Sequence, residues 1–300
     1  MTIRPLDHPG IAPGRSPGKP RASGRALALA LALATVHALG APSGASAQSA
    51  GGDADPWSPE VEWEWWGSAV ESDSKYVAAA PIVIDLDGDR LPEVVFVSIP
   101  GHSNAGMLRV LSGRDGSERF SALDPSIDHF ATMSLAAGDL DGDCRPEIVS
   151  VLQPGPHPEY TSRSVALRHD GSLAWRSAPH WCRAGDCSPS LADVDHDGLA
   201  ELSFGSTVLN AGGGLRWQHA EPWEYHAIGL FVDLLAEPGL ELVGNARIHA
   251  ADGRALWAGD GSIARYAAVA NFDADPEAEV VRAGRNWIEL REPDGRLIWG

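Results

Sequence analysis

Closely spaced carboxylates are the residues of this sequence whose types and spacing best suit chemistry. The stretch PIVIDLDGDRLPEVVFVS, residues 81–98, places Asp85, Asp87 and Asp89 at alternate positions, with Glu93 four residues after the last. Without a counter-charge these groups would repel one another. Oxygen ligands select hard cations, and calcium accepts roughly six to eight of them more readily than magnesium's strict octahedron does. The pattern therefore indicates a calcium site.

The acidic nonapeptide occurs five times. Its copies are DLDGDRLPE, DLDGDCRPE, DVDHDGLAE, DLLAEPGLE and NFDADPEAE, and they begin at Asp85, Asp139, Asp193, Asp233 and Asn271. Each copy keeps an acid or an amide at position 1 and a glutamate at position 9. Successive copies are 54, 54, 40 and 38 residues apart. Because periods of about 20–50 residues are typical of propellers and solenoids, the sequence predicts a repeat architecture.

The acidic loops do not fit an EF-hand. That loop needs a bidentate glutamate at position 12 and a helix on each side. Position 12 here is Phe96, Ser150 or Phe204, and β-forming residues flank the loops. A compact loop between two strands can nevertheless bring positions 1, 3, 5 and 9 together around one ion.

A second motif follows each acidic loop and indicates hairpins. RDGSERF, HDGSLAW, GGGLRW, ADGRALW and PDGRLIW place an aromatic residue four positions after a glycine. Asp-Gly between apolar runs is a strong hairpin signal. Each repeat thus predicts four antiparallel strands in about 40 residues, which is one propeller blade. Because blades must stack to bury their faces, we expect the aromatic residues to pack between blades: Phe120, Trp175, Trp217, Trp257 and Trp299.

At these residues the chain resembles a known family. DLDGDRLPE, DLDGDCRPE and DVDHDGLAE, each leading into an apolar strand, are similar to the calcium loops of FG-GAP or VCBS-type repeats, the blades of integrin-α-like β-propellers. The resemblance implies that Ca²⁺ is bound by the side chains of positions 1, 3, 5 and 9 and by the carbonyl of position 7. The implied ligands are Asp85, Asp87, Asp89, Leu91, Glu93, Asp139, Asp141, Asp143, Arg145, Glu147, Asp193, Asp195, Asp197, Leu199, Glu201, Asn271, Asp273, Asp275, Glu277 and Glu279.

The loops depart from the family pattern at position 6, where the family usually has glycine. Only the loop at Asp193 keeps it, as Gly198, and we expect that loop to bind best. Arg90 and Cys144 would have to adopt a left-handed conformation at a cost of roughly 1 kcal/mol each. Pro238 and Pro276 cannot adopt that conformation, because the proline ring fixes φ at a negative value. The loop at Asp233 is expected to be empty, because its position 3 is a leucine.

The N-terminal segment predicts export. Residues 26–39 are an apolar run of about 14, shorter than the roughly 20 that span a bilayer; basic residues precede the run, and the small-residue motif ASAQ follows it. Cleavage after Ala47 would leave 18 basic against 40 acidic residues, which disfavours nucleic-acid binding. We expect a protein without a membrane span that is secreted or extracytoplasmic, in the periplasm or at the cell surface. In that oxidising setting Cys182 and Cys187 are spaced to close a small disulfide loop.

The predicted organisation is a signal peptide at 1–47, a linker at 48–60 and an all-β propeller of four-stranded antiparallel blades at 61–300. The predicted blades are about 78–122, 132–178, 188–220, 228–260 and 266–300. The segment VEWEWWGS, residues 61–68, has the pattern of an outermost blade strand. Five repeats are visible where similar propellers have about seven, so we expect an incomplete ring, open between its first and last blades.

Two classes of function remain open. The sequence contains no Gly-x-Ser-x-Gly elbow, zinc-protease helix motif or phosphate loop, and no catalytic residue is predicted. The loop at 216–226, with His219, Trp223, Tyr225 and His226, is either a sugar or peptide site or an ordinary connection between blades. The first class is a calcium-binding adhesion or scaffold module for an extracellular protein or glycan. The second is a secreted propeller enzyme, similar to a polysaccharide lyase or a quinone-dependent dehydrogenase.

Overall fold

The computed structural model describes residues 59–300, except 102–104, 123, 125–126, 128, 131–132, 153–160, 183–186, 220–226, 236–237, 245 and 263. Every regular element in this part of the chain is a β-strand. It contains no helix long and apolar enough to cross a membrane. The predicted signal peptide at 1–47 and all but the last two residues of the predicted linker lie outside the described residues. The expectation of an all-β chain is therefore confirmed for the described residues.

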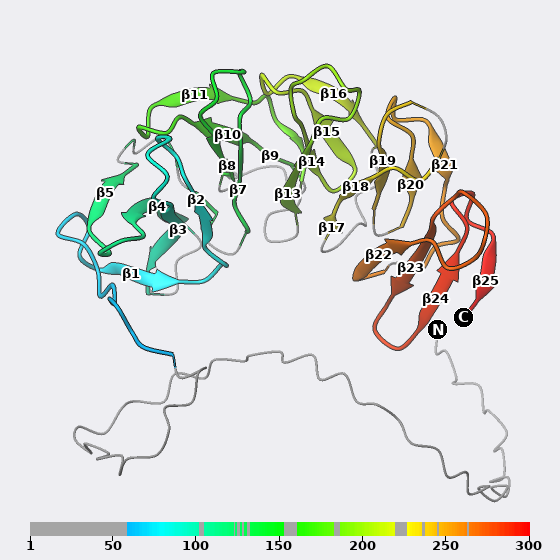
Figure 1. Ribbon diagram of the computed structural model, residues 1–300, viewed down its shortest axis with the longest axis horizontal. Helices are drawn as coiled ribbons and strands as arrows, with labels where there is room; N and C mark the ends of the chain where they lie inside the picture. The colour runs from blue at the N-terminus through cyan, green and yellow to red at the C-terminus, as the bar shows by residue number, and fades with distance from the viewer. Residues whose placement is uncertain are drawn as a thin grey trace, which may run out of the picture. The chain divides into compact units, whose positions relative to one another are not determined.

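Five antiparallel sheets follow one another in chain order (Figure 1). The first has the order β1-β3-β4-β5, with β2 also paired to β3 and β6 to β4; its strands are β1 (Ser74–Val77), β2 (Ile82–Ile84), β3 (Glu93–Pro100), β4 (Ala105–Ser112), β5 (Glu118–Ser121) and β6 (His129–Phe130). The second is formed by β7 (Ala136–Gly138), β8 (Glu147–Val151), β10 (Ser164–Leu167) and β11 (Leu173–Arg176).

The remaining sheets repeat the same order of four neighbouring strands. The third contains β13 (Cys187–Ala192), β14 (Glu201–Phe204), β15 (Thr207–Leu209) and β16 (Leu215–Gln218), with β17 (Ala227–Ile228) added in parallel to β13. The fourth contains β18 (Leu230–Val232), β19 (Glu241–Val243), β20 (Ile248–His249) and β21 (Ala255–Trp257). The fifth contains β22 (Tyr266–Ala270), β23 (Glu279–Ala283), β24 (Ile288–Arg291) and β25 (Leu297–Trp299). A separate pair joins β9 (Thr161–Ser162) to β12 (His180–Trp181).

The last strand of each sheet carries a β-bulge at the same place. In the first sheet, Val110 pairs with Phe120 and Leu111 with Glu118, which leaves the intervening residue unpaired. The other four sheets show the same shift in register. The five bulged residues are Arg119, Ala174, Arg216, Leu256 and Ile298. Because a bulge redirects a side chain, each sheet can aim one residue of its outer strand away from the regular alternation.

Aromatic residues pack against the turn glycines of the following sheet. A Cβ built on Gly213, which has φ +79°, would lie 2.5 Å from Trp175 of the preceding sheet, so only glycine allows this contact. The same relation joins Phe120 to the second sheet's turn, Trp217 to the fourth's and Trp257 to the fifth's. The predicted packing between sheets is therefore confirmed for these four aromatic residues. It is wrong for Trp299, which is 48% exposed and contacts no glycine of another described sheet.

The segment at residues 61–68 forms no strand, contrary to expectation. It lies against the first sheet instead. Trp63 covers Gly116 as the other aromatic residues cover their glycines, and its Nε1 donates to the Gly113 carbonyl at 2.9 Å. Trp65 meets Phe96 edge-on, with ring centroids 5.0 Å apart. These ring contacts hold the segment on the sheet without a strand ladder.

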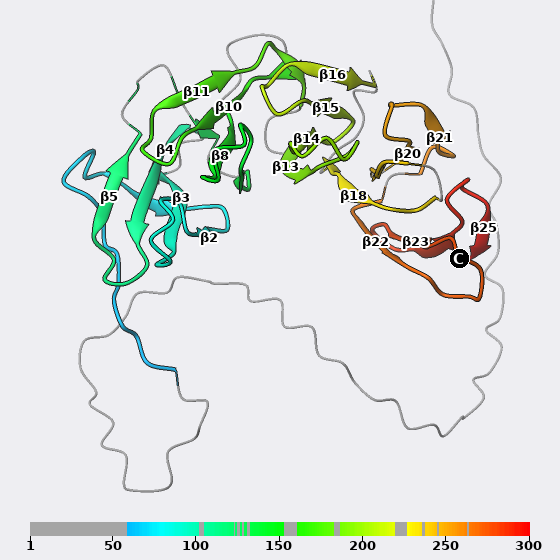
Figure 2. The same ribbon diagram turned by 45° about the horizontal axis from the view of Figure 1, so that its top comes forward.

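Three clusters of buried apolar side chains lie between successive sheets. One joins residues of the first and second sheets, another the second and third, and another the fourth and fifth. Cys182 and Cys187 are both buried in the second cluster, and their pairing stays a prediction. The described residues form no closed ring or barrel: β1–β5 and β22–β25 end the series in both views (Figures 1 and 2). The propeller itself therefore stays a proposal.

Candidate metal centre

The first acidic loop is shaped by hydrogen bonds from its backbone to its own aspartates. The N–H groups of Gly88 and Arg90 each donate to Asp85, both at 2.8 Å, and the Leu91 N–H donates to Asp89 at 2.7 Å. Short polar side chains that accept from the backbone two to five residues ahead favour tight turns. The acid at position 1 therefore folds the loop between β2 and β3 as well as supplying charge.

The glutamate at position 9 is anchored in the same way in all five repeats. In the first repeat Glu93, at the start of β3, accepts the Leu86 N–H through Oε2 at 3.0 Å. The other four repeats have the equivalent bond at 2.9, 2.9, 2.8 and 2.5 Å. All five glutamates are buried: Glu93, Glu147, Glu201, Glu241 and Glu279. One carboxylate oxygen is thus committed to the backbone, and the other remains for a further partner.

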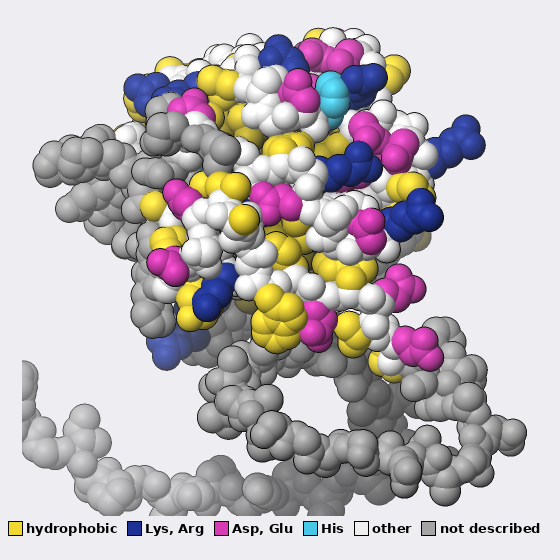
Figure 3. Space-filling view, turned by 90° about the vertical axis from the view of Figure 1, so that its left-hand side faces the viewer, with side chains coloured by type: hydrophobic (Ala, Val, Ile, Leu, Met, Phe, Trp, Pro, Cys, Tyr) yellow, Lys and Arg dark blue, Asp and Glu magenta, His cyan; other side chains and the backbone are white. Residues whose placement is uncertain are grey.

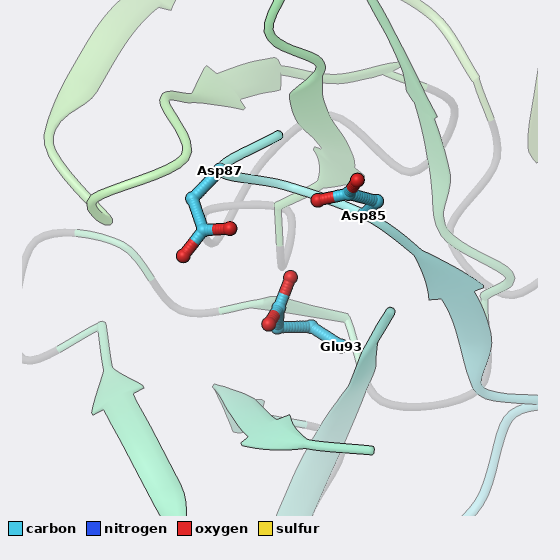
Figure 4. A group of neighbouring side chains, drawn as sticks. All are labelled: Asp85, Asp87 and Glu93. Atoms are coloured by element: carbon cyan, nitrogen blue, oxygen red, sulfur yellow. The ribbon is translucent and has the colours of Figure 1, made fainter. Parts of the chain in front are cut away.

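Four loops bring three acids together closely enough to share one ion. In the first, Asp85, Asp87 and Glu93 direct their carboxylates toward a common space (Figure 4). Within each group, one oxygen from every member lies within 4.8 Å of the others. The remaining groups are Asp139, Asp141 and Glu147; Asp193, Asp195 and Asp197; and Asp273, Asp275 and Glu279. Such clusters of oxygen ligands suit a hard cation.

The fifth repeat gives the clearest sign that an acidic group can hold a cation. Glu279 is fully buried, and its Oε1 has no hydrogen-bond partner. A buried carboxylate oxygen without a partner is costly unless a positive charge meets it. A cation held by Glu279, Asp273 and Asp275 would remove that cost, so the residues present fit a bound metal ion.

Some predicted ligands lie outside these groups. Asp89, Asp143 and Glu201 belong to none of them. The position 7 carbonyls of Leu91, Arg145, Leu199 and Glu277 stay predicted ligands, as does Asn271. The Asn271 amide donates to the Asp275 carbonyl at 2.6 Å and to the Glu277 carbonyl at 3.2 Å.

The loop at Asp233 has a different interior. Its described residues contribute to no acidic group. Leu235, at position 3, instead packs in the apolar cluster with Leu256 and Trp257. At position 3 the fourth repeat thus has a packed apolar side chain where the others have an acid. The expectation that this loop binds no ion stays a prediction.

Backbone strain is spread more evenly than the sequence suggests. Arg90 and Cys144 adopt left-handed conformations, with φ of 70° and 66°, as expected. Gly198 has φ of 93°, but His196, two residues earlier, also has a positive φ, of 61°. The third loop therefore carries a strained non-glycine residue too. Gly198 therefore does not make the backbone of this loop less strained than that of the others, and the reason for expecting it to bind calcium best no longer holds.

Two arginines, Arg119 and Arg216, reach the carboxylates of acidic loops, a feature that the sequence analysis missed. Arg119 Nη1 lies 3.0 Å from Asp87, and its Nη2 lies 2.8 Å from Glu93 Oε1. The second contact lacks hydrogen-bond alignment and is an ion pair. Burial lowers the pKa of Arg119, but the carboxylates around it give a net rise. On the face of the first sheet, basic side chains lie beside acidic ones (Figure 3).

The second loop lacks such a cation. Burial raises the pKa of Glu147, and the charges of Asp141, Asp143 and Asp139 raise it further. No ion pair among the described residues of the chain includes any of these four acids. The sequence does carry the distinguishing signal: arginine stands directly before the aromatic residue in RDGSERF and GGGLRW but not in HDGSLAW.

The predicted aromatic loop is only partly described, because residues 220–226, including Trp223, Tyr225 and His226, lie outside the described residues. His219 stacks on His249 with ring centroids 4.3 Å apart and lies 5.6 Å from the Trp217 ring. These contacts place His219 between sheets, and the proposed sugar or peptide site stays a prediction.

Comparison with known proteins supports the repeat family. The model of the FG-GAP-like repeat matches residues 85–150, which contain the first two acidic loops. No curated protein matches the sequence. The biofilm matrix protein Bap1 of V. cholerae has a similar solved structure, with 26% identity and a TM-score of 0.65 over 80% of this chain.

Rhamnogalacturonan lyases share the fold at lower identity. Lyase YesW has 22% identity and a TM-score of 0.57, and lyase PL11 of Bacillus licheniformis has 20% identity and a TM-score of 0.56. Each alignment covers 76% of this chain and 47% of the lyase, whereas the alignment with Bap1 covers 42% of that protein. The chain therefore spans less than half the length of these proteins.

Proposed function

We propose that the chain is a calcium-binding β-propeller module that acts outside the cytoplasm as a binding or scaffold element. The observation that carries the metal assignment is the fully buried Glu279, whose Oε1 lacks a partner beside Asp273 and Asp275. Carboxylates at this spacing, in loops between strands, favour calcium over magnesium. When bound, the ion would offset most of a cluster's negative charge and hold the loop between two neighbouring strands of its sheet.

The propeller assignment is supported by the uniform stacking of the sheets. Four sheets place an aromatic residue on the next sheet's turn glycine, and the same four-stranded order recurs throughout. A regular relation between successive sheets is what radial repetition requires.

The scaffold role is supported by the similarity to Bap1, whose name places it in a biofilm matrix. A matrix component meets polysaccharides and other matrix proteins, so we propose an extracellular glycan or protein as the partner. The similar lyases suggest polysaccharide cleavage as a second candidate function, but identities of 20–22% show the fold alone.

Thermal unfolding of the full chain tests the calcium assignment. At a hundredfold excess over Kd, an ion bound only to the native state adds about 2.7 kcal/mol per site. We expect the melting temperature to fall in excess EGTA and to recover with calcium but not with magnesium. Asp141→Asn should reduce that recovery, whereas Asp233→Asn, in the loop whose described residues form no acidic group, should leave it unchanged. An identical melt with and without EGTA would overturn the assignment.

Incubation with acidic polysaccharides, including rhamnogalacturonan, separates the two roles. A scaffold module should retain the polymer in a calcium-dependent manner without shortening it. A lyase would release products with a new carbon–carbon double bond, seen by their ultraviolet absorbance. Turnover of this kind would replace the scaffold role with the enzymatic one.

A further inference from the structure

The bulged residue of each outer strand stands at the same register position but differs in chemistry. It is arginine in the first and third sheets, alanine in the second, leucine in the fourth and isoleucine in the fifth. In the sheets with arginine, this residue reaches the acidic loop of its own sheet. The bulge therefore gives each repeat one position from which it can fill, or leave open, its cluster of carboxylates.

In the first sheet the arginine contacts the acidic group directly. Arg119 pairs with Asp87 at 3.0 Å, with Glu93 Oε1 at 2.8 Å and with Asp89 at 3.5 Å. Two of these acids, Asp87 and Glu93, belong to the group that could share an ion. The guanidinium thus pairs with the glutamate oxygen that the backbone leaves available.

The third sheet repeats this arrangement. Arg216 pairs with Asp195 at 2.8 Å and with Glu201 Oε1 at 2.9 Å. The other oxygen of Glu201 accepts the Val194 N–H. Glu201 is also absent from the acidic group of its loop, which contains only the three aspartates. The arginine takes the glutamate that would otherwise complete the cluster.

The other repeats place uncharged side chains at the bulge. Ala174 packs against the apolar cluster between the second and third sheets. Its methyl side chain carries no charge that could pair with the loop carboxylates. Leu256 packs in the same cluster as Leu235, so both the acid and its counter-ion are replaced by leucine in the fourth repeat. The fifth repeat has Ile298 at the bulge, and the available oxygen of Glu279 has no partner there.

We propose that the bulged residue decides which acidic loops take up calcium. Arg119 and Arg216 are built-in counter-ions that offset part of the negative charge of the first and third loops, so these loops hold their shape without metal. Among the described residues, no ion pair links an arginine or a lysine to the acidic groups of the loops at Asp139 and Asn271, so these loops take their cation from solvent. Of the four acidic groups, two therefore bind calcium tightly in the native chain. This inference rests on the proposed calcium binding and adds which loops perform it.

Removal of each arginine should open a loop to calcium. The first loop borders a cavity of about 320 Å³, lined also by His169 and Asp170 of the second sheet's turn, so an ion and its waters have room there. Replacement by alanine copies the residue that the second repeat has at the bulge. The converse change, Ala174→Arg, should fill the second loop in the way that the first and third are filled.

Calcium stoichiometry from isothermal titration of the full chain tests the proposal. We expect two tight sites in the native chain, one more in each of Arg119→Ala and Arg216→Ala, and one fewer in Ala174→Arg. Arg114→Gln is the matched control: it removes a positive charge from the turn of the first sheet, and its only hydrogen bond among the described contacts runs from its backbone N–H to Ser112. It should leave the count at two.

The outcomes separate this proposal from the calcium assignment. Four sites of equal affinity in the native chain, or alanine variants that add no site, would overturn the role of the bulge and leave calcium binding intact. If neither the native chain nor any variant binds calcium, the calcium assignment fails as well. If Ala174→Arg does not fold, the two alanine variants still decide the question, because each removes an exposed or half-exposed side chain.

Discussion

At the scale of single residues, the first three acidic loops divide their carboxylates between two tasks. The aspartate at position 1 and one oxygen of the glutamate at position 9 hold the backbone, as Asp85 and Glu93 do in the first loop. The remaining oxygens gather into the cluster. A substitution at position 9 therefore affects folding and ion binding together, and the two effects differ in their dependence on calcium.

Glu279→Gln separates these effects. The amide oxygen can still accept the Phe272 N–H, but the buried charge is gone. Without calcium we expect the variant to be as stable as the native chain or more stable, because an unpartnered buried charge is costly. With calcium we expect it to lose part of the native stabilisation. Glu241→Gln is the control, because its loop forms no acidic group among the residues that the structure describes, and it should respond to calcium as the native chain does.

Thermal melts of both variants with EGTA and with calcium provide the measurement. An equal calcium response in Glu279→Gln and the native chain would show that this loop holds no ion.

A second residue-scale prediction concerns acid stability. Burial lowers the pKa of His129 to about 4 from its ordinary value of 6.5, and its Nδ1 bonds to Ser150 at 2.8 Å. The unfolded chain binds the proton first as pH falls, so this histidine's contribution to stability is complete above about pH 6.5 and is lost between there and about pH 4. His129→Gln, which cannot take up this proton, should show a shallower fall in the free energy of unfolding between pH 7 and pH 4.5.

Denaturant titrations across that pH range give the slope. Equal slopes in the variant and the native chain would contradict the buried, neutral state of His129.

Sequence patterns predicted much of the residue-scale picture. The nonapeptide motif identified all four acidic groups, and the rule for position 6 predicted the left-handed Arg90 and Cys144. The sequence patterns did not predict the roles of Arg119 and Arg216. In a regular strand, a residue next to the recurring aromatic residue would point to the opposite face of the sheet. The bulge breaks that alternation, and a bulge depends on backbone pairing that the sequence does not state.

At the scale of elements, the aromatic-on-glycine contact joins one sheet to the next. Trp175 lies over Gly213 of the third sheet, whereas Trp299 ends the fifth sheet with 48% of its surface exposed. We expect Trp175→Ala to destabilise the chain by about 3–5 kcal/mol, as large-to-small changes in cores do. Trp299→Ala, a chemically identical change, should cost well under half of that.

Equilibrium unfolding by denaturant compares the two variants directly. Equal losses of stability would show that the aromatic residues do not act by packing between sheets.

The hairpin signals predicted the order of strands within the sheets, because an Asp-Gly turn fixes which strands are neighbours. They failed for the segment at 61–68. Its Trp-rich pattern resembles an outer strand, but side-chain contacts of Trp63 and Trp65 with the first sheet replace the ladder. Aromatic side chains favour strands and packed surfaces alike, so composition alone did not separate the two.

At the scale of the whole molecule, the fifth sheet leaves large apolar side chains exposed. Tyr266, Phe272, Ile298 and Trp299 are among them. Apolar side chains gathered into an exposed patch favour association. We expect the sedimentation coefficient of the full chain to rise with concentration, and Ile298→Lys to weaken that dependence. A chain that stays monomeric at all concentrations would contradict an uncovered sheet face.

The central claim is that the acidic loops bind calcium, and an anomalous difference map from crystals grown with calcium tests it most directly. We predict peaks about 2.3–2.6 Å from carboxylate oxygens in the loops at Asp139 and Asn271, with Asp141, Glu147, Asp273 and Glu279 among the ligands. The first and third loops should retain their arginines and show weaker peaks or none. A map without a peak at any of the four acidic groups would contradict the account.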